Sequence, residues 1–159
     1  MSSKPATRTK IAVILSSLLP LYSASADNDY RLRIDKLPAY QQECSSCHLA
    51  YPPALLPAKS WQRIMNNLEN HFGTDASLDE ATTQDISRWL EANSGGHKAA
   101  RTEPPEDRIT QSRWFIHEHD EIRDEVWLRP SIKSAANCAA CHTSADQGEF
   151  DEDFIRIPK

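Results

Sequence analysis

The stretches ECSSCHLA (Glu43–Ala50) and NCAACHTS (Asn137–Ser144) carry the same five-residue pattern near opposite ends of the chain. In each stretch two cysteines, separated by two residues, are followed directly by a histidine. The chain has four cysteines, and all of them lie within these two patterns: Cys44, Cys47, Cys138 and Cys141. The fold and the chemistry of the protein therefore depend on what two thiols and one imidazole bind, twice.

Two ordinary explanations account for the cysteines alone. In an exported protein an even cysteine count usually predicts disulfides, and two Cys-x-x-Cys pairs would also supply four thiolates to zinc. Neither explains a histidine after the second cysteine of both copies, whereas attachment of a c-type haem does. Two cysteines form thioethers with the porphyrin, and the adjacent imidazole binds the iron. The sequence predicts two haem c groups, with His48 and His142 as proximal iron ligands.

Residues 1–26 are typical of a secretory leader. Three basic side chains precede an apolar run over residues 11–21, and Ala24-Ser25-Ala26 forms a small-x-small cleavage site. The apolar run is shorter than the roughly 20 residues that span a bilayer as a helix. We expect export to the periplasm and cleavage before Asp27, with retention as an uncleaved anchor as a minor alternative.

The charge of the chain limits the choice of partners. The formal net charge is −5, and removal of the basic leader makes the remainder more acidic. Nucleic acid and anionic membrane surfaces are therefore poor candidates, while a basic face on another protein fits better. With ten prolines but only four glycines, the remaining sequence does not resemble a disordered tract.

The distal iron ligands have to come from the other histidines or from Met65. Apolar residues at helical spacing predict a helix over residues 60–72, with Ser60 as its N-cap and Gly73 just beyond its end. Met65 lies within the apolar stripe, so we expect it to pack in the core. His71 lies at the edge of that stripe. It either interacts with the helix terminus or ligates iron, and the sequence favours ligation.

A second helix is predicted over residues 77–93. It begins at the capping box SLDE, and it ends before Ser94-Gly95-Gly96. Residues 94–107, which include Pro104-Pro105, are the most convincing linker. We expect His97, in this polar segment, to be exposed to solvent.

A third helix is predicted over residues 110–126, and its phase distinguishes two histidines. At 100° per residue, His119 shares a face with the apolar Phe115 and Val126, whereas His117 points in nearly the opposite direction. His119 is therefore the predicted ligand and His117 a surface residue.

Two haems with two axial ligands each need four imidazoles, and the selected histidines supply four: His48, His71, His119 and His142. Attachment motif, loop and helix follow one another as in a class I cytochrome c, so we expect His71 to serve the first haem and His119 the second. The predicted fold is mainly α with little or no sheet. A cytochrome c-like unit (27–93) is joined by the linker (94–107) to a loop-rich second haem unit (108–159).

Three longer segments, 40–79, 108–122 and 137–153, together with a closing Ile157-Pro158, resemble the diheme cytochrome c family of the bacterial periplasm. The Tyr-Pro-Pro, Leu-Leu-Pro and His-Phe-Gly elements that follow the first motif carry much of the resemblance. It implies two low-spin, low-potential haems, the four histidine ligands given above, and a role in electron transfer. It also implies redox partners such as a small oxygen-binding haem protein or a membrane-bound cytochrome b.

Bis-histidine ligation favours an electron carrier over an enzyme. Two imidazoles leave no open position on the iron, and replacing a methionine ligand by histidine lowers the potential. The alternatives are a small diheme peroxidase or reductase with a displaceable distal histidine, and a haem sensor that exchanges ligands. The segment with Pro52-Pro53 and Pro57 is expected to wall one haem face. Six aromatic residues would surround the porphyrins or fill the core: Trp61, Phe72, Trp89, Trp114, Phe115 and Trp127.

Overall fold

The computed structural model describes Leu32 and residues 36–159. The predicted leader, residues 1–26, lies outside this part of the chain. Regular structure in the described residues is helical, with one isolated bridge between His71 and Thr74 and no strand, which confirms the mainly α fold class. No helix in the described part has the length and apolar character needed to span a membrane.

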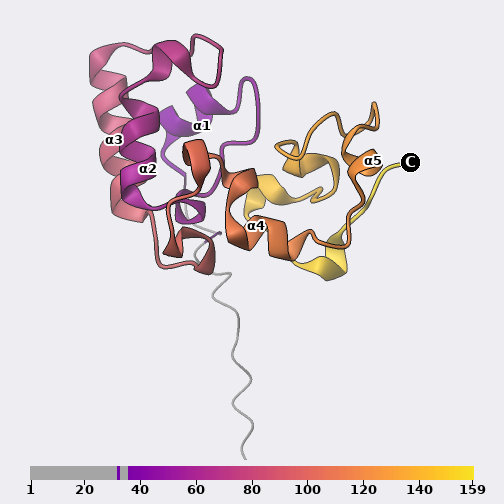
Figure 1. Cartoon of the computed structure of the whole chain (residues 1–159). Helices are drawn as coiled ribbons and strands as arrows, with labels where there is room; N and C mark the ends of the chain where they lie inside the picture. The colour runs from indigo at the N-terminus through magenta and orange to yellow at the C-terminus, as the bar shows by residue number, and fades with distance from the viewer. Residues whose placement is uncertain (1–31, 33–35) are drawn as a thin grey trace, which may run out of the picture.

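Five α-helices and a series of short 3-10 helices make up the fold of the described residues (Figure 1). The α-helices are α1 (Pro38–Cys44), α2 (Ala58–Met65), α3 (Glu80–Asn93), α4 (Arg113–Glu118) and α5 (Asp124–Trp127). The 3-10 helices are η2 (Pro53–Leu55), η3 (Leu68–Asn70), η4 (Lys98–Arg101), η5 (Pro105–Asp107), η6 (Ile109–Gln111), η7 (Cys138–Ala140), η8 (Ala145–Gln147) and η9 (Glu152–Phe154). In Figure 1, α1, α2 and α3 lie together on one side, α5 and the C-terminus on the other, and α4 between them.

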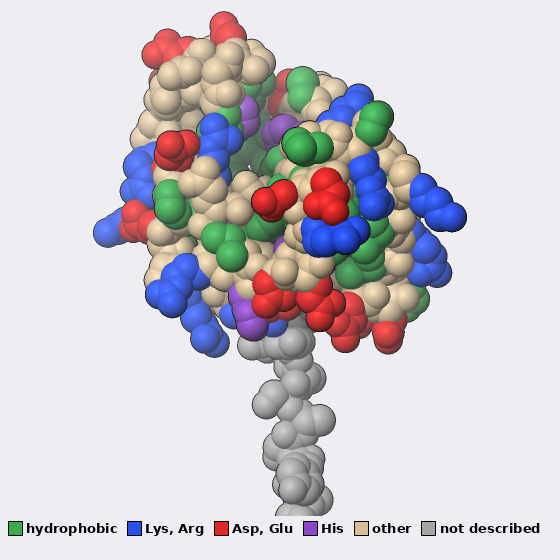
Figure 2. All heavy atoms as spheres, turned by 45° about the vertical axis from the view of Figure 1, so that its right-hand side comes forward, with side chains coloured by type: hydrophobic (Ala, Val, Ile, Leu, Met, Phe, Trp, Pro, Cys, Tyr) green, Lys and Arg blue, Asp and Glu red, His purple; other side chains and the backbone are tan. Residues whose placement is uncertain are grey.

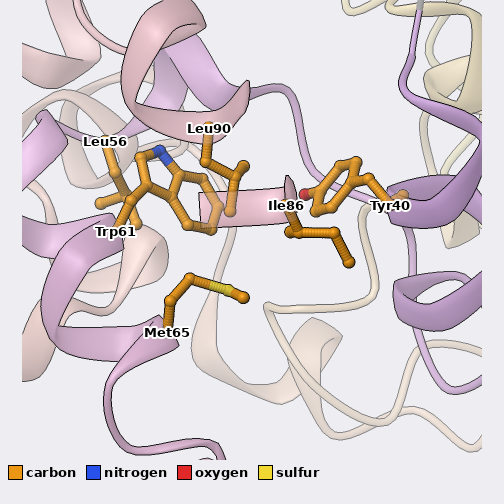
Figure 3. Packing of buried hydrophobic residues seen from close by; sticks show 7 residues of the cluster. Tyr40, Leu56, Trp61, Met65, Ile86 and Leu90 are labelled. Atoms are coloured by element: carbon orange, nitrogen blue, oxygen red, sulfur yellow. The ribbon is translucent and has the colours of Figure 1, made fainter. Parts of the chain in front are cut away.

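The main core lies between α2 and α3 (Figure 3). Its buried members are Tyr40, Ala50, Leu56, Trp61, Met65, Ile86 and Leu90. The indole Nε1 of Trp61 donates a 2.8 Å hydrogen bond to the carbonyl of Pro53, which satisfies its polar atom inside the core. Met65 packs in this cluster, as the apolar periodicity predicted. Each large apolar side chain buried here contributes about 1.5–3 kcal/mol.

The helix predicted over 60–72 is displaced and shorter. α2 begins at Ala58, Ser60 is buried within it rather than capping it, and the helix ends at Met65. Asn66 and Asn67 follow, and asparagine side chains compete for backbone hydrogen bonds, which favours helix ends and turns. Only the 3-10 turn η3 continues beyond them.

The predicted second helix starts three residues late and ends at the predicted residue. The N-cap of α3 is Asp79, not Ser77, because the Asp79 carboxylate accepts the backbone N–H of Thr82 at 3.0 Å. After Asn93 the chain turns through Gly95 and Gly96, at φ 72° and 77°, a backbone region that favours glycine.

The third predicted helix is interrupted. α4 is capped by Ser112, whose hydroxyl accepts the N–H of Phe115 at 3.0 Å, and it stops at Glu118. The ring Nδ1 of His119 lies 2.9 Å from the carbonyl oxygen of Phe115, the group that the next helical N–H would otherwise use. A side-chain contact therefore ends the helix at His119, and the chain resumes a helix only at α5.

The segment predicted as a linker packs against its surroundings. His97 is 4% exposed, so the expectation of a solvent-exposed side chain is wrong. Its Nδ1 accepts the N–H of Ala99 at 3.1 Å, and its ring meets Trp114 edge to face at 5.2 Å. The polar composition of the segment concealed this local cap. The division of the chain at residues 94–107 stays a prediction.

Candidate functional site

The first Cys-x-x-Cys-His motif borders a cavity of about 470 Å³, within the size range of ligand pockets. Cys44, Cys47, His48 and His71 line it together with apolar side chains that include Tyr40, Leu56, Trp61, Ile64, Met65, Leu68 and Leu90. Figure 2 shows a hollow on one face of the molecule, with histidine and hydrophobic side chains inside it. A mostly apolar cavity with two thiols and two imidazoles suits a large flat cofactor better than a small polar substrate.

His48 is oriented for metal binding by its own backbone. It directly follows Cys47 beyond α1, and its Nδ1 lies 2.7 Å from the carbonyl oxygen of Leu49. An imidazole that donates Nδ1–H to this carbonyl presents the lone pair of Nε2, the usual arrangement in histidine ligands. The ring also stacks on Tyr51, with centroids 4.9 Å apart and planes at 19°.

His71 is held by a tight turn. Its N–H donates to the carbonyl of Thr74 at 2.8 Å, and the N–H of Thr74 donates back at 3.1 Å. Phe72 and Gly73 complete the turn with φ 51° and 94°. Burial and the neighbouring His48 lower the pKa of His71, which favours the neutral, metal-binding form.

In the second motif, a 3-10 turn positions the histidine. The N–H of His142 donates to the carbonyl of Cys138 at 2.8 Å across η7. His119 lies opposite, and its Nδ1 contact with Phe115 leaves Nε2 available, as in His48. Burial, together with His119, lowers the pKa of His142.

The structure brings the four predicted ligands together in two pairs. The ring centroids of His48 and His71 are 6.0 Å apart with planes at 22°, and those of His119 and His142 are 6.2 Å apart with planes at 74°. His117, in contrast, has a side chain that is 81% exposed and lies 4.0 Å from Asp120, consistent with a surface residue. The roles of the paired histidines as iron ligands stay predictions.

Both spacings fit a metal ion held between two imidazoles. Imidazole–metal bonds are about 2.0–2.1 Å long, and a ring centre lies roughly 1 Å behind its nitrogen, so opposed rings should have centroids about 6 Å apart. The thiols of each motif are free in the described part of the chain. Burial raises the pKa of both Cys44 and Cys138 to about 11. The residues present therefore fit two covalently attached haems.

Aromatic side chains enclose the second histidine pair. Phe115 stacks on His119 at 4.0 Å, Trp127 lies 5.8 Å from the same ring, and Phe150 lies 5.2 Å from His142. Phe115 and Trp127 thus surround a candidate ligand, one of the two environments expected for them.

The other expected aromatic residues divide between cavity and core. Trp61 and Phe72 line the first cavity, whereas Trp89 packs on Tyr40 and Trp114 packs on His97. Pro52 and Pro53 are fully buried and are not among the residues that line this cavity.

Tyr51 and Phe150 are site residues that the sequence reasoning missed. Tyr51 lines the first cavity, and its hydroxyl donates a 2.6 Å hydrogen bond to the carbonyl of Ala136. Burial, and secondarily Cys138, raises the pKa of Tyr51, so its hydroxyl keeps the proton that it donates. For Tyr51 the signals in the sequence were its position three residues after His48 and its place in the Tyr-Pro-Pro element of the family resemblance. Phe150 lies in the acidic stretch that follows the second motif, and its only signal was its place in the segment 137–153 that resembles the family.

Comparisons with known proteins agree with these features. The sequence profile of the dihaem cytochrome c family matches residues 40–150. The crystal structure of DHC purified from Rhodobacter sphaeroides is similar, with 43% identity, a TM-score of 0.64, and coverage of 74% of this chain and 99% of that one. A diheme cytochrome type c from Shewanella baltica is 40% identical, with a TM-score of 0.69 and coverage of 79% of this chain and 95% of the other. The comparison with curated proteins gives no significant match.

Proposed function

Since the chain belongs to the dihaem cytochrome c family, we propose that it is a periplasmic electron carrier with two bis-histidine haem c groups. Membership of the family implies two c-type haems and haem-based electron transfer. When bound, each haem supplies an iron that gains and loses one electron. The protein supplies the attachment, the axial ligands and the surroundings that set the potential.

Each haem would be held by one motif and one distant histidine. Cys44 and Cys47 would attach the first haem, and His48 and His71 would bind its iron. Cys138 and Cys141 would attach the second haem, and His142 and His119 would bind its iron. This assignment agrees with the geometry, because each pair of rings lies beside the cysteines of its own motif.

The observation that carries the proposal is the pairing of imidazoles at 6.0 and 6.2 Å. With the haems bound, these histidines would fill both axial positions of each iron and would keep substrate from the metal. Electron transfer needs no open position, whereas peroxidase or reductase chemistry at the iron does. The contacts of His48 with Leu49 and of His119 with Phe115 also fix the ring orientations before the metal binds.

The proposed location and partners rest on the sequence. A secretory leader and c-type haem attachment both favour the periplasm. A net charge of −5 favours docking to a redox partner through a basic face. Partners of the kind that the family resemblance implies, a small oxygen-binding haem protein or a membrane cytochrome b, satisfy the requirement for electron exchange.

Carbon monoxide distinguishes a carrier from an enzyme or a sensor. We expect the reduced protein to keep its low-spin visible spectrum when it is mixed with carbon monoxide, because both axial positions are filled. Extraction with acid acetone should leave both haems on the polypeptide. Rapid formation of a carbon monoxide adduct at either haem would contradict the proposal and favour a displaceable distal ligand.

A further inference from the structure

Tyr51 lies at the junction of the two motifs. It follows His48 by three residues, and its ring stacks on the imidazole of His48 with centroids 4.9 Å apart. Its backbone is anchored separately, because the buried Tyr40 donates its hydroxyl to the carbonyl of Tyr51 at 2.7 Å. The stack and this anchor together fix the direction of the phenol.

The hydroxyl of Tyr51 reaches the other motif. It donates a 2.6 Å hydrogen bond to the carbonyl of Ala136, a residue 85 positions later in the chain. The carbonyl oxygen of Ala136 also lies 3.8 Å from the sulfur of Cys138, the first attachment cysteine of the second motif. Tyr51, Ala136 and Cys138 all line the cavity of the first motif. One side chain thus connects the proximal histidine of one site to the attachment segment of the other.

We propose that Tyr51 is a positioning residue that joins the two haem sites and provides the main electron path between them. The path runs from the His48 ring through the phenol and its hydrogen bond to the Ala136 carbonyl and Cys138. Electronic coupling is stronger across packed and hydrogen-bonded atoms than across a gap of the same length. One electron leaves the reduced site and arrives at the oxidised one. Tyr51 keeps its proton and its electrons, and no bond is made or broken.

The inference rests on the proposed function. The Tyr51→Phe variant tests it by removing only the phenol oxygen. This variant keeps the stack on His48 and loses the hydrogen bond to Ala136. Ser131→Ala is the control, since it also loses one hydroxyl-to-carbonyl hydrogen bond, the one to Lys159, but at an exposed position outside the cavity of the first motif. Both proteins are purified with their haems, and one electron is injected rapidly. The exchange between the two haems is then followed, and both midpoint potentials are titrated.

We expect Tyr51→Phe to slow inter-haem exchange several-fold with unchanged potentials, and Ser131→Ala to exchange at the wild-type rate. A Tyr51→Leu variant, which also loses the ring stack, should be slower still. Wild-type exchange in Tyr51→Phe and Tyr51→Leu would overturn the inference, as would equal slowing in Tyr51→Phe and Ser131→Ala, which indicates a general structural effect. Carbon monoxide binding by the wild-type protein would refute the electron-carrier proposal instead, and that result is independent of these rates.

Discussion

The two histidine pairs have nearly the same separation but different orientations and different surroundings. In the first pair, the ring planes meet at 22° beside a core formed by α2 and α3. In the second, they meet at 74°. Aromatic rings contact the histidines of both pairs, Tyr51 and Phe72 in the first and Phe115, Trp127 and Phe150 in the second. A metal held between two imidazoles, as we propose, would require the common distance, whereas the local backbone sets the angle. The comparison therefore separates what the haem requires from what each half of the chain determines.

Removal of a distal ligand should give the largest effect. His119→Ala removes the second imidazole opposite His142, so we expect one of the two haems to become high-spin and to bind carbon monoxide, while the other stays low-spin. His71→Ala should do the same at the first haem. Visible and electron paramagnetic resonance spectra of the two variants check this.

His117→Ala is the matched control for the ligand experiment. The His117 side chain is 81% exposed, so its loss should leave both haems low-spin. If His117→Ala became high-spin and His119→Ala stayed low-spin, the helical-phase argument that selected His119 would be wrong.

Deletion of core volume tests the difference in surroundings. Leu90 is fully buried against the α2–α3 core, so Leu90→Ala should lower the free energy of unfolding by about 2–5 kcal/mol. Leu128 is 79% exposed, and Leu128→Ala should change the free energy of unfolding by no more than about 0.5 kcal/mol. Denaturant unfolding of the haem-loaded proteins measures both. A small effect of Leu90→Ala would show that haem attachment, rather than this core, holds the first unit.

The ring orientations predict two different ferric signals. Near-parallel imidazole planes give an ordinary rhombic low-spin signal, and near-perpendicular planes give a broad signal with a much larger maximum g value. We expect the first haem to give the former and the second the latter, in equal amounts, at liquid-helium temperature. In His119→Ala the large-g signal should disappear while the rhombic one stays. Two identical rhombic signals in the wild type would show that haem binding rotates a ring away from its orientation here.

Much of the candidate site was predictable because its signals are local. The two motifs are contiguous, and the phase of residues 110–126 selected His119 even though the helix breaks at that residue. The break depends on the contact between the His119 ring and the Phe115 carbonyl, which no periodicity reveals. The burial of His97 was hidden by its polar neighbours.

Other site features depend on contacts between distant residues. Tyr51 meets Ala136 across 85 residues, and a single sequence carries no sign of that hydrogen bond. The packing of the predicted linker on α2 also comes from long-range ion pairs: Arg63 donates to Asp107 at 2.6 and 2.8 Å and to Glu103 at 2.7 Å. Patterns along the chain therefore predicted what is attached to each motif, and not how the two halves are joined.

The smallest expected effect concerns the attachment of the linker to the first unit. Hydrogen bonds from Arg63, partly offset by burial, hold the pKa of Asp107 below its ordinary value of 3.8. The folded protein therefore gains stability from the ionised carboxylate above the unfolded pKa, and this gain is lost as the pH falls through the lower folded value. Because Arg63 is half exposed, the contribution should be no more than about 1 kcal/mol.

Asp107→Asn isolates this contribution. We expect the variant to melt slightly below the wild type at pH 7, and the difference between their melting temperatures to vanish as the pH falls below the ordinary Asp value of 3.8. Asp85→Asn is the control, because Asp85 pairs with Arg88 on the exposed face of α3 and should melt like the wild type throughout. A difference that persisted at low pH would show that Asp107 contributes through packing rather than charge. Packing alone would then hold the segment from Ser94 to Asp107 against the first unit.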